Sequence, residues 1–489
     1  MKRYILAIDE GTTSERVVLY DTKVEKIIDF DQSKLTQYYP KNGWVEHDAE
    51  EIFNKVNASL NNLLTKHKLS PDDIFGIGIT NQRETTVAWN KKTGKPISKA
   101  ICWQCRRTAD ICNSVRKTTI QKLKEKTGLI LDAYFSATKM RWILENVSKA
   151  KELEKQDLLC FGTIDSFLIY RLTKGKVFAT DTTNASRTML VDISKPFEYD
   201  PELLRYFGIK KETLPTIKNS ADNFGYAETT IGQIPICSCI GDQQSSLFGQ
   251  GCTEVGNAKC TYGTGAFILL NTGNKLHKEN EKLLNTVAYS ISNQTSYAVE
   301  GSVFNVGSAL NYVKNTLGLI EEYKLINEMC KSVKDTDGVI FVPAFTGLGA
   351  PYWKSNARAQ ISGISFSTNK NHIVRACIES FAYSIYAIAK YLKELRIKPT
   401  ELMTDGGVSN NDFLLQYQSS LLEIPVKKST ESESTSMGTI YLTGLISGAY
   451  KSISEIKSKI SYSKIMKPKK LTDGEKSSLK LWLKEVEKI

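Results

Sequence analysis

The fold is decided by the stretch "YILAIDEGTTSERVVLYD", residues 4–21, in which a polar turn separates two apolar runs. A tight hairpin needs only two turn residues, typically Asn-Gly or Asp-Gly. This turn instead contains Gly11 and three consecutive hydroxyl side chains, with Asp9 before it and Arg16 after it. Backbone N–H groups of a glycine-containing turn can point together at an anion, and hydroxyl groups add further donors. The stretch therefore predicts a strand–turn–strand unit that binds phosphate.

The segments around this turn predict strands that alternate with helices. Residues 4–36 form three successive apolar runs joined by short turns. After "GWVEHD", Asp48 is placed to cap a helix, with Glu51 three residues later. Four apolar residues then fall on one face of that helix: Ile52, Val56, Leu60 and Leu63. The run "IFGIGIT", residues 74–80, reads as a buried strand, and this alternation is typical of an α/β protein.

The second half of the chain repeats the strand-then-glycine pattern. "AKCTYGTGAFILLNTG", residues 258–273, has a Thr/Gly turn that runs directly into an apolar strand. "GVIFVPAFTG", residues 338–347, and "LMTDGGVSNNDFLLQ", residues 402–416, add similar transitions. Separated glycine-rich turns of this kind favour a polyphosphate nucleotide bound between two domains. The chain has neither the G-x-x-x-x-G-K-[ST] pattern of P-loop enzymes nor the G-x-G-x-x-G dinucleotide pattern.

The length of 489 residues exceeds what one hydrophobic core supports, so at least two domains are expected. We place them at residues 1–250 and 251–489. The second domain would end in a lysine-rich tail from about residue 450. Its last stretch, "EKSSLKLWLKEVEKI", reads as a solvated helix.

Composition narrows the possible partners and the compartment. The 65 Lys and Arg residues exceed the 53 Asp and Glu residues and give a net charge of +12. Nucleic-acid binding is one interpretation of that charge, but the lysines are spread along the chain without interleaved aromatics, so we expect no nucleic-acid partner. Cys102 and Cys105 have zinc-like spacing without a second ligand pair, which favours reduced thiols. With no apolar run near about 20 residues, we expect a cytoplasmic protein without a membrane span.

Several motifs together resemble the FGGY family of carbohydrate kinases, from residue 4 to about residue 445. They are "DEGTTSERVV", "GWVEHD", "GITNQRETT", "WQCRR", "DTTNASRTML", "GDQQSSLFGQG", "TYGTGAF", "FVPAFTGLGAPYW" and "DGG". "ITNQRETT" and "GDQQ" resemble in particular the members that phosphorylate glycerol. The resemblance implies two ribonuclease-H-like domains, as in actin, hexokinase and heat-shock ATPases, with ATP in the cleft between them.

The resemblance also implies a glycerol site. Arg83 would donate hydrogen bonds to glycerol hydroxyls and Glu84 would accept them. Asp242 would be the catalytic base that takes the proton of the attacking hydroxyl. The other expected contacts are Trp103 and Phe267 as apolar walls, Tyr134 as a hydrogen-bonding group, and Gln243 beside glycerol or the metal.

The same resemblance assigns the nucleotide and metal contacts. Asp9 and Asp242 would hold Mg²⁺, which neutralises the ATP phosphates. The expected phosphate-binding residues are Thr12, Thr13, Ser14, Arg16 and Thr264. The expected contacts to the base and ribose are Gly307, Asn311, Gly407 and Asn411.

Three residues depart from the family pattern. Glu10 stands where Gln is usual, Glu15 stands where a small residue is common, and Asn311 replaces Gln. Two additional carboxylates beside a triphosphate should weaken nucleotide binding unless they point away or meet a lysine. Asn311 should loosen the contacts to adenine.

The leading hypothesis is an ATP:glycerol 3-phosphotransferase that forms a homo-oligomer, a dimer or a tetramer. Another polyol or pentulose kinase would need a wider pocket, against which Trp103, Tyr134 and Phe267 argue. An actin-like or chaperone-like ATPase switch shares the fold but needs no Arg-Glu polyol clamp. A degenerate kinase retained for binding is a further alternative, motivated by Glu10 and Glu15.

Overall fold

The first lobe is built on a mixed sheet with the strand order β12-β13-β6-β1-β2-β3. The computed structural model describes residues 2–489. The strands are β1 (Tyr4–Glu10), β2 (Ser14–Asp21), β3 (Lys26–Lys34), β6 (Ile74–Asn81), β12 (Tyr226–Thr229) and β13 (Gly232–Gly241). β1 pairs antiparallel with β2 and parallel with β6, and β6 pairs parallel with β13. The predicted strands of residues 4–36 and 74–80 are confirmed.

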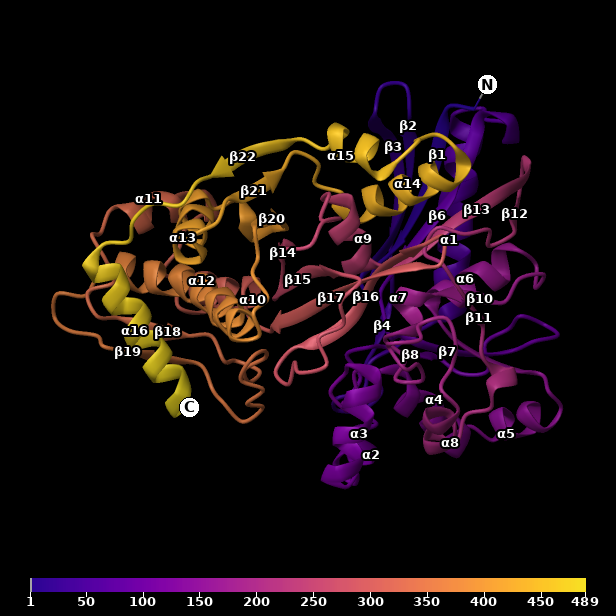
Figure 1. Cartoon of the computed structure of the whole chain (residues 1–489), viewed down its shortest axis with the longest axis horizontal. Helices are drawn as coiled ribbons and strands as arrows, with labels where there is room; N and C mark the ends of the chain where they lie inside the picture. Colours follow the sequence, from indigo (N-terminus) through magenta and orange to yellow (C-terminus); the bar gives the residue numbers. More distant parts are fainter. Residues whose placement is uncertain (1) are drawn as a thin grey trace.

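One face of this sheet is covered by α1 (Ala49–Lys66) and α6 (Ile164–Leu172) (Figure 1). Asp48 caps α1 as predicted, because its carboxylate accepts hydrogen bonds from the backbone N–H groups of Glu50 and Glu51. The predicted apolar face is confirmed: Ile52, Val56, Leu60 and Leu63 are buried against Leu6, Ile8, Val17 and Leu19 of the sheet.

The second lobe is built on a sheet with the order β16-β17-β15-β14-β20-β21-β22. Its strands are β14 (Asn257–Tyr262), β15 (Ala266–Gly273), β16 (Leu284–Ile291), β17 (Gln294–Val303), β20 (Glu401–Asp405), β21 (Val426–Ser429) and β22 (Tyr462–Met466). Three helices share a core with one face of this sheet: α10 (Gly307–Asn311), α12 (Lys370–Glu394) and α13 (Asp412–Leu422). The predicted Thr/Gly hairpin is the β14–β15 pair.

Two helices lie between the sheets and join the lobes: α9 (Asp242–Gly249) and α14 (Ser434–Ser447). Their shared core includes Ala7 of β1, Leu247 of α9, Leu269 of β15, Met403 of β20 and Ile440 of α14. The helices approach so closely that a Cβ at Gly438 would lie 1.9 Å from the carbonyl oxygen of Ser245. Although α14 lies late in the chain, it therefore packs on the first lobe's sheet.

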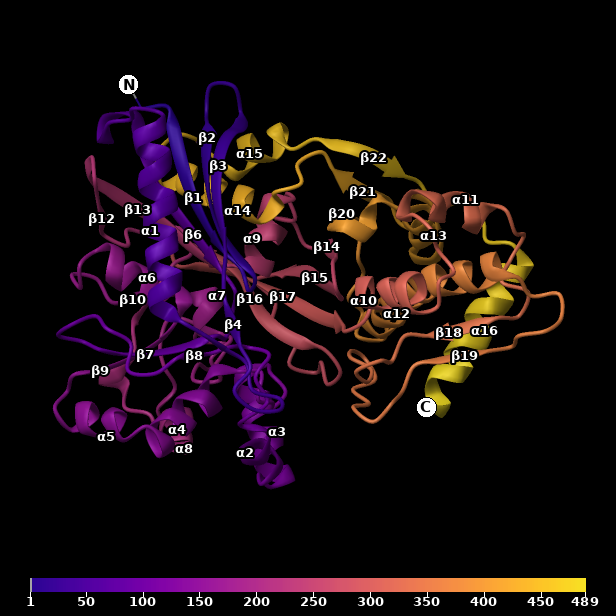
Figure 2. The ribbon, with the colours of Figure 1, turned by 180° about the vertical axis from the view of Figure 1, so that it is seen from behind.

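A smaller sheet with the order β4-β5-β8-β7-β9 extends the first lobe at its lower end (Figure 2). Its strands are β4 (Gln37–Tyr38), β5 (Glu46–His47), β7 (Thr86–Asn90), β8 (Ala100–Ile101) and β9 (Leu159–Thr163). The helices of this region are α2 (Ala109–Asn113), α3 (Lys117–Thr127), α4 (Ser136–Asn146), α5 (Ser148–Lys155) and α8 (Pro201–Phe207). Other short elements are β10 (Ala179–Asp181), α7 (Thr182–Ala185), β11 (Thr216–Lys218), α11 (Ile326–Lys331), β18 (Ile340–Val342) and β19 (Gln360–Ser362).

The C-terminal segment differs from the prediction of a solvated helical tail. After α15 (Ile453–Lys459), β22 pairs antiparallel with β21 and extends the second sheet. The last helix, α16 (Asp473–Lys488), buries Trp482 and Val486 in the core of the second lobe. The indole Nε1 of Trp482 donates to the carbonyl oxygen of Phe341 at 2.9 Å. The prediction is wrong because two apolar residues four positions apart are enough to seat one face of α16.

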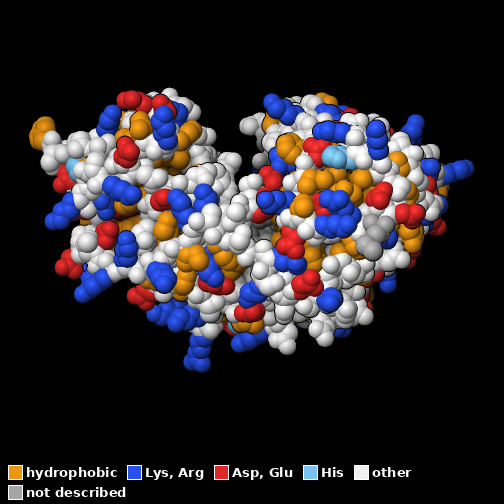
Figure 3. Space-filling model, turned by 90° about the horizontal axis from the view of Figure 1, so that it is seen from above, with side chains coloured by type: hydrophobic (Ala, Val, Ile, Leu, Met, Phe, Trp, Pro, Cys, Tyr) orange, Lys and Arg blue, Asp and Glu red, His pale blue; other side chains and the backbone are white. Residues whose placement is uncertain are grey.

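A deep groove separates the two lobes in the space-filling view of Figure 3. In Figures 1 and 2, α9 lies near the centre of the molecule, where the lobes meet. Within residues 2–489, no helix combines the length and the hydropathy that a membrane crossing requires.

Candidate active site

Asp242 lies at the edge of the first sheet where several parallel strands end. β13 ends at Gly241, whose register partner on β6 is Asn81, and Asp9 of β1 is level with Thr80. Because the carboxyl ends of parallel strands meet at one edge, the residues that follow them converge there. The Asp242 carboxylate accepts from the N–H of Gln243 at 2.7 Å and lies 3.4 Å from Nε of Arg83. With a side-chain exposure of 30%, it is accessible to a ligand.

Arg83 is the centre of a buried ion-pair network. Its guanidinium contacts Glu300 through Nη1 at 2.7 Å and Nη2 at 3.2 Å, and Nη1 also donates to Gln244 at 3.2 Å. Arg187 donates through Nε to Glu84 at 2.6 Å and lies 3.3 Å from Glu300. Although burial opposes ionisation, the charges of Arg187 and Arg83 lower the pKa of Glu300 to about 2. The two guanidiniums therefore hold Glu300 in its charged form.

Sequence reasoning predicted Arg83 and Glu84 but missed Arg187 and Glu300. Arg187 lies in the "DTTNASRTML" motif. The motif contributes to the family resemblance, but the sequence predicts no role for any single residue in it. Glu300 is a single acidic residue within "YAVEGSV", an otherwise uncharged strand. That isolated charge was the signal that could have identified it, because a carboxylate is seldom fully buried without a partner.

Glu84 is held in a left-handed backbone conformation, with φ of 62°. Its carbonyl oxygen accepts from the hydroxyls of Ser136 and Thr86, both at 3.1 Å, and from Nζ of Lys139 at 3.5 Å. Burial lowers the pKa of Lys139 to about 8. These donors stabilise a backbone conformation that non-glycine residues seldom adopt, while the Glu84 side chain is held by Arg187.

The predicted aromatic residues approach this network from both lobes. Trp103 donates from its indole Nε1 to Oγ1 of Thr12 at 2.9 Å, and its ring lies edge-on to Tyr134 at 5.6 Å. Burial raises the pKa of Tyr134, which keeps its hydroxyl neutral. Phe267 of β15 is opposite Thr261 of β14, so it shares a sheet face with Thr261. The structure thus links Trp103 directly to Tyr134 and to the turn at residues 11–14.

Gln243 is tied to the second lobe through a buried lysine. The ammonium of Lys259 donates to Oε1 of Gln243 at 2.6 Å and to Oγ1 of Thr261 at 2.9 Å. Burial lowers the pKa of Lys259, while the charges of Asp405 and Asp242 act in the opposite direction. Lys259 was not predicted, and it adds a positive group to the surroundings of Asp242.

The second Thr/Gly turn packs against the start of α10. The N–H of Gly307 donates to the carbonyl of Gly263, and the N–H of Val306 donates to that of Thr264, both at 3.0 Å. A Cβ at Gly307 would lie 2.6 Å from the Gly263 oxygen, so this position needs glycine. At Gly407, in contrast, a Cβ would meet no atom within 4 Å. The space beside Gly407, in the turn that follows β20, is therefore open.

The N-terminus of α14 joins the first turn to the second. The hydroxyl of Ser436 donates to Asp9 at 3.0 Å, and that of Ser434 donates to Asp405 at the end of β20. Asp405 precedes Gly406, which lies directly against the backbone of Tyr262 at the end of β14. The strand ends that precede the turns at residues 11–14 and 262–265 therefore flank one helix terminus, as a shared phosphate site requires.

Three predicted nucleotide contacts have side chains that are already engaged. Arg16 forms an ion pair with Glu433 and donates to Gln32. The amide oxygen of Asn311 accepts a hydrogen bond from the hydroxyl of Tyr323. Asn411 caps α13, because its amide oxygen accepts from the N–H of Leu414. The phosphate contact expected of Arg16 and the base or ribose contacts expected of Asn311 and Asn411 therefore stay predictions, and each would compete with the hydrogen bond or ion pair that the side chain already makes.

The two acidic departures do not add two negative charges to the phosphate turn. Glu15 points toward α1, where it accepts from the hydroxyl of Ser59 at 2.8 Å, and burial raises its pKa to about 7. Glu10 is fully buried and accepts from the amide of Gln82 at 2.9 Å. Burial raises the pKa of Glu10 well above its usual value, which favours the neutral form of this side chain. The structure thus weakens the argument for a degenerate kinase.

Glu15→Gln should stabilise the protein at high pH and not at low pH. The folded pKa of Glu15 is about 7, compared with 4.5 for an unperturbed Glu. Because the folded state favours the neutral form of Glu15, its contribution to the free energy of unfolding is fully present below pH 4.5. This contribution is lost as the pH rises through 7. We expect the variant to gain about 1–3 kcal/mol at pH 8 and almost nothing at pH 4.5. Urea unfolding at both pH values measures the difference, with the exposed Glu198→Gln as the control, and an equal effect at both would contradict the assignment.

A buried cluster of Asp165, Asp181 and Cys239 has ligand atoms close enough for a metal ion. Its carboxylates are already satisfied, since Asp165 accepts from Thr163 and Thr180 and Asp181 caps α7. The cluster positions α7, which leads directly to Arg187. Its role is structural.

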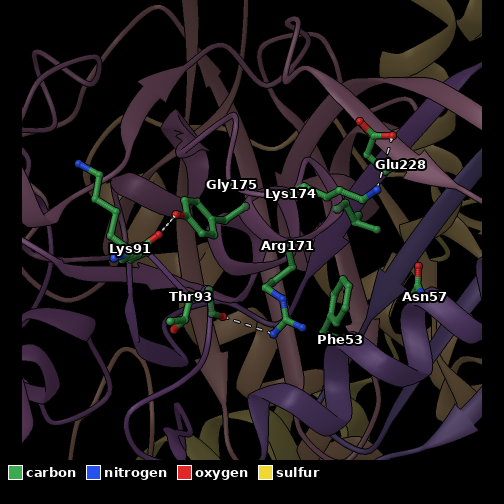
Figure 4. Close-up of a pocket in the computed structure, with 12 residues that line it drawn as sticks. Phe53, Asn57, Lys91, Thr93, Arg171, Lys174, Gly175 and Glu228 are labelled. Atoms are coloured by element: carbon green, nitrogen blue, oxygen red, sulfur yellow. Dashed lines mark hydrogen bonds and ion pairs between the residues drawn. The ribbon is translucent and has the colours of Figure 1, made fainter.

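A separate cavity of about 440 Å³ opens on the first lobe and is shown in Figure 4. Its charged groups are paired locally: Arg171 binds Glu50 at 2.5 Å, and Lys174 lies 4.0 Å from Glu228. Figure 4 shows the Lys91 side chain extending away from the other lining residues. The lining includes none of the residues predicted for ATP or glycerol, so this cavity is not the candidate active site.

Comparison with known proteins agrees with the geometry. Sequence models for the FGGY family of carbohydrate kinases match residues 4–249 with the N-terminal domain and residues 258–446 with the C-terminal domain. The glycerol kinase of Fusobacterium nucleatum subsp. nucleatum is 45% identical over 494 residues, covering 99% of each chain. That of Mycoplasma capricolum subsp. capricolum is 45% identical over 503 residues, covering 100% of this chain and 99% of its own.

Solved structures show the same architecture. Plasmodium falciparum glycerol kinase with ADP superposes with a TM-score of 0.93 at 34% identity, covering 99% of this chain and 98% of that chain. A ligand-bound xylulose kinase from Lactobacillus acidophilus reaches 0.86 at 23% identity, with 99% and 96% covered, and shows the fold alone. The predicted two-domain, actin-like α/β fold is confirmed. The protein belongs to the FGGY family of carbohydrate kinases.

Proposed function

We propose that this protein transfers the γ-phosphoryl group of ATP to glycerol and forms sn-glycerol 3-phosphate. The observation that carries this proposal is the position of Asp242, an accessible carboxylate at the sheet edge beside Arg83. Relatives with about the same length and 45% identity carry the name glycerol kinase. The family resemblance and the site geometry thus support one activity.

Glycerol would bind to the side chains around Arg83. Arg83 and Glu84 supply a donor and an acceptor for hydroxyl groups, while Trp103 and Tyr134 supply an aromatic wall. Phe267, which shares a sheet face with Thr261 and Glu300, would form the apolar wall on the side of the second lobe. Gln243, held by Lys259, is a further polar contact. Because Trp103 packs against both Tyr134 and Thr12, this arrangement favours a small polyol over a longer pentulose.

Asp242 accepts the proton of the attacking hydroxyl as its oxygen approaches the phosphorus atom. Phosphoryl transfer has a loose transition state, so little proton transfer is needed early in the reaction. Positioning and charge stabilisation therefore supply most of the rate, and proton acceptance contributes about 10²–10⁴-fold. The hydrogen bond from the Gln243 N–H fixes one carboxylate oxygen of Asp242.

The donor set fits Mg²⁺, which prefers oxygen ligands and is commonly bound by one or two carboxylates together with phosphates. Burial, together with the nearby charge of Asp242, raises the pKa of Asp9 to about 7. A divalent cation would relieve this repulsion, and Asp9 and Asp242 are the residues that would hold it. When bound, it neutralises phosphate charge. Ser436 orients Asp9 through its hydroxyl.

The ATP phosphates are assigned to the turns that contain Thr12, Thr13, Ser14 and Thr264, with Gly307 and Gly407 toward the base and ribose. Movement of the two lobes across their groove would exclude water from the phosphoryl group. All ten cysteines are free and buried, which supports a reducing compartment such as the cytoplasm. The homo-oligomer expected from the sequence stays a prediction.

A coupled assay of ADP release tests the proposed function. With Mg-ATP, we expect turnover that depends on glycerol and is at least tenfold less efficient, by kcat/KM, with D-xylulose. Chelation of Mg²⁺ by EDTA should abolish turnover, and added Mg²⁺ should restore it. Glycerol-independent ATP hydrolysis would favour the ATPase-switch alternative, and a preference for the pentulose would favour the other kinase.

A further inference from the structure

We infer that Glu300, which comes from the second lobe, is a positioning residue for the glycerol site of the first lobe. Glu300 contacts both guanidiniums of the site, Arg83 at 2.7 Å and Arg187 at 3.3 Å. Arg187 in turn holds Glu84 at 2.6 Å. This inference rests on the proposed function and names a residue that completes its substrate site.

The contacts form a closed ring of alternating charge. Glu300 binds Arg83 through both carboxylate oxygens, and the same Oε1 atom also contacts Arg187. Arg187 contacts Glu84, whose Oε1 lies 4.0 Å from Nε of Arg83 and closes the ring. A bidentate contact fixes the plane of a guanidinium as well as its position. Glu300 therefore sets the orientation of Arg83 toward the site.

β17, a strand of the second lobe's sheet, carries Glu300 to this position. Glu300 is paired with Leu269 of β15, and Phe267 lies two residues earlier on the same strand face. The same sheet face thus presents the predicted wall Phe267 and the clamp Glu300. The glycerol site is complete only when the second sheet is packed against the first lobe.

Stability alone does not account for this arrangement. Glu300, Arg83 and Arg187 are each at most 3% exposed, and buried ion pairs are often no more stabilising than apolar side chains of similar volume. The positive charge of Arg83 also acts against that of Arg187. Without Glu300, the two guanidiniums would compete for Glu84, and Arg83 would be drawn toward Asp242. Glu300 therefore keeps both Glu84 and Asp242 available to substrate.

The test compares Glu300→Gln with Glu379→Gln. Glu379 forms an equally buried ion pair with Arg375 at 2.7 Å, but it lies on α12 within the second lobe. For Glu300→Gln we expect the KM for glycerol to rise about 10–100-fold, as loss of a charge-assisted contact predicts, while the KM for ATP changes less than twofold. Glu379→Gln should lower the melting temperature without changing the KM for glycerol.

A second variant covers the case in which Glu300→Gln does not fold. Glu300→Asp keeps the buried charge but is one methylene shorter, so it should raise the KM for glycerol by an intermediate amount. Loss of stability in both Glu300 variants with an unchanged KM for glycerol would overturn the inference alone. A wild-type protein without glycerol turnover would overturn the proposed function and the inference with it.

Discussion

Replacing Asp242 with Asn is expected to lower kcat by about 10²–10⁴-fold and to change glycerol affinity less than about fivefold. Asn has nearly the same shape and retains one acceptor oxygen for the N–H of Gln243. It does not accept the hydroxyl proton at neutral pH, so the loss should appear in kcat. Steady-state kinetics with calorimetric titration of glycerol separates the two effects.

Two controls distinguish the roles assigned to Asp242. Asp222→Asn, a partly exposed residue elsewhere in the first lobe, should leave kcat unchanged. If Asp242 acts mainly as a metal ligand, raising the Mg²⁺ concentration should restore much of the activity of Asp242→Asn. If it acts as the base, activity should stay low at every Mg²⁺ concentration. Normal turnover of the variant would exclude both roles.

Local patterns were sufficient to predict the first lobe's strands and its first helix. The alternation in residues 4–36 and the one-sided burial of Ile52, Val56, Leu60 and Leu63 depend on near neighbours, which a sequence contains. The family resemblance added the fold of the whole chain. Neither the local patterns nor the family resemblance predicts which side chains of one lobe contact the other lobe.

The missed residues act across long separations in the chain. Glu300 is 217 positions from Arg83, and Arg187 is 103 positions from Glu84. No local periodicity connects such pairs, because the contact exists only after both sheets are assembled. The same limit applies to Ser436, which reaches Asp9 across 427 positions.

The unexpected behaviour of Glu15 and α16 has a different cause. A formal charge read from the sequence does not include burial, which directs Glu15 toward α1 and raises its pKa. Likewise, the many lysines of the C-terminal segment concealed the fact that Trp482 and Val486 share one helix face. In both cases the environment of the side chain, rather than its type, decided the outcome.

The domain boundary expected near residue 250 falls between α9 and β14. Yet α14, from the second half of the chain, packs on the sheet of the first lobe and supplies Ser436 to Asp9. A linear division into residues 1–250 and 251–489 therefore separates groups that work together. The proposed phosphate site depends on both halves, because Ser436 of α14 in the second half binds Asp9 at the end of β1 in the first.

Arg83→Ala should weaken glycerol binding and also destabilise the protein. The sequence predicts mainly the first effect, since Arg83 is assigned to a glycerol hydroxyl. Loss of such a charge-assisted hydrogen bond corresponds to about 1.5–3 kcal/mol, or roughly a 10–150-fold rise in the KM for glycerol. The structure adds a second effect, because the substitution leaves Glu300 buried with only Arg187 beside it. Removing one partner of a buried ion pair costs about 3–5 kcal/mol.

Arg375→Ala separates the two effects of Arg83→Ala. Arg375 is similarly buried and pairs with Glu379, so its loss should produce a comparable decrease in the free energy of unfolding. Because Arg375 lies outside the candidate active site, the KM for glycerol should be unchanged in that variant. Chemical unfolding and steady-state kinetics of both variants provide the comparison. If Arg83→Ala lost stability like Arg375→Ala and kept its KM for glycerol, Arg83 would be a structural residue, and Glu84 would have to bind the hydroxyls without it.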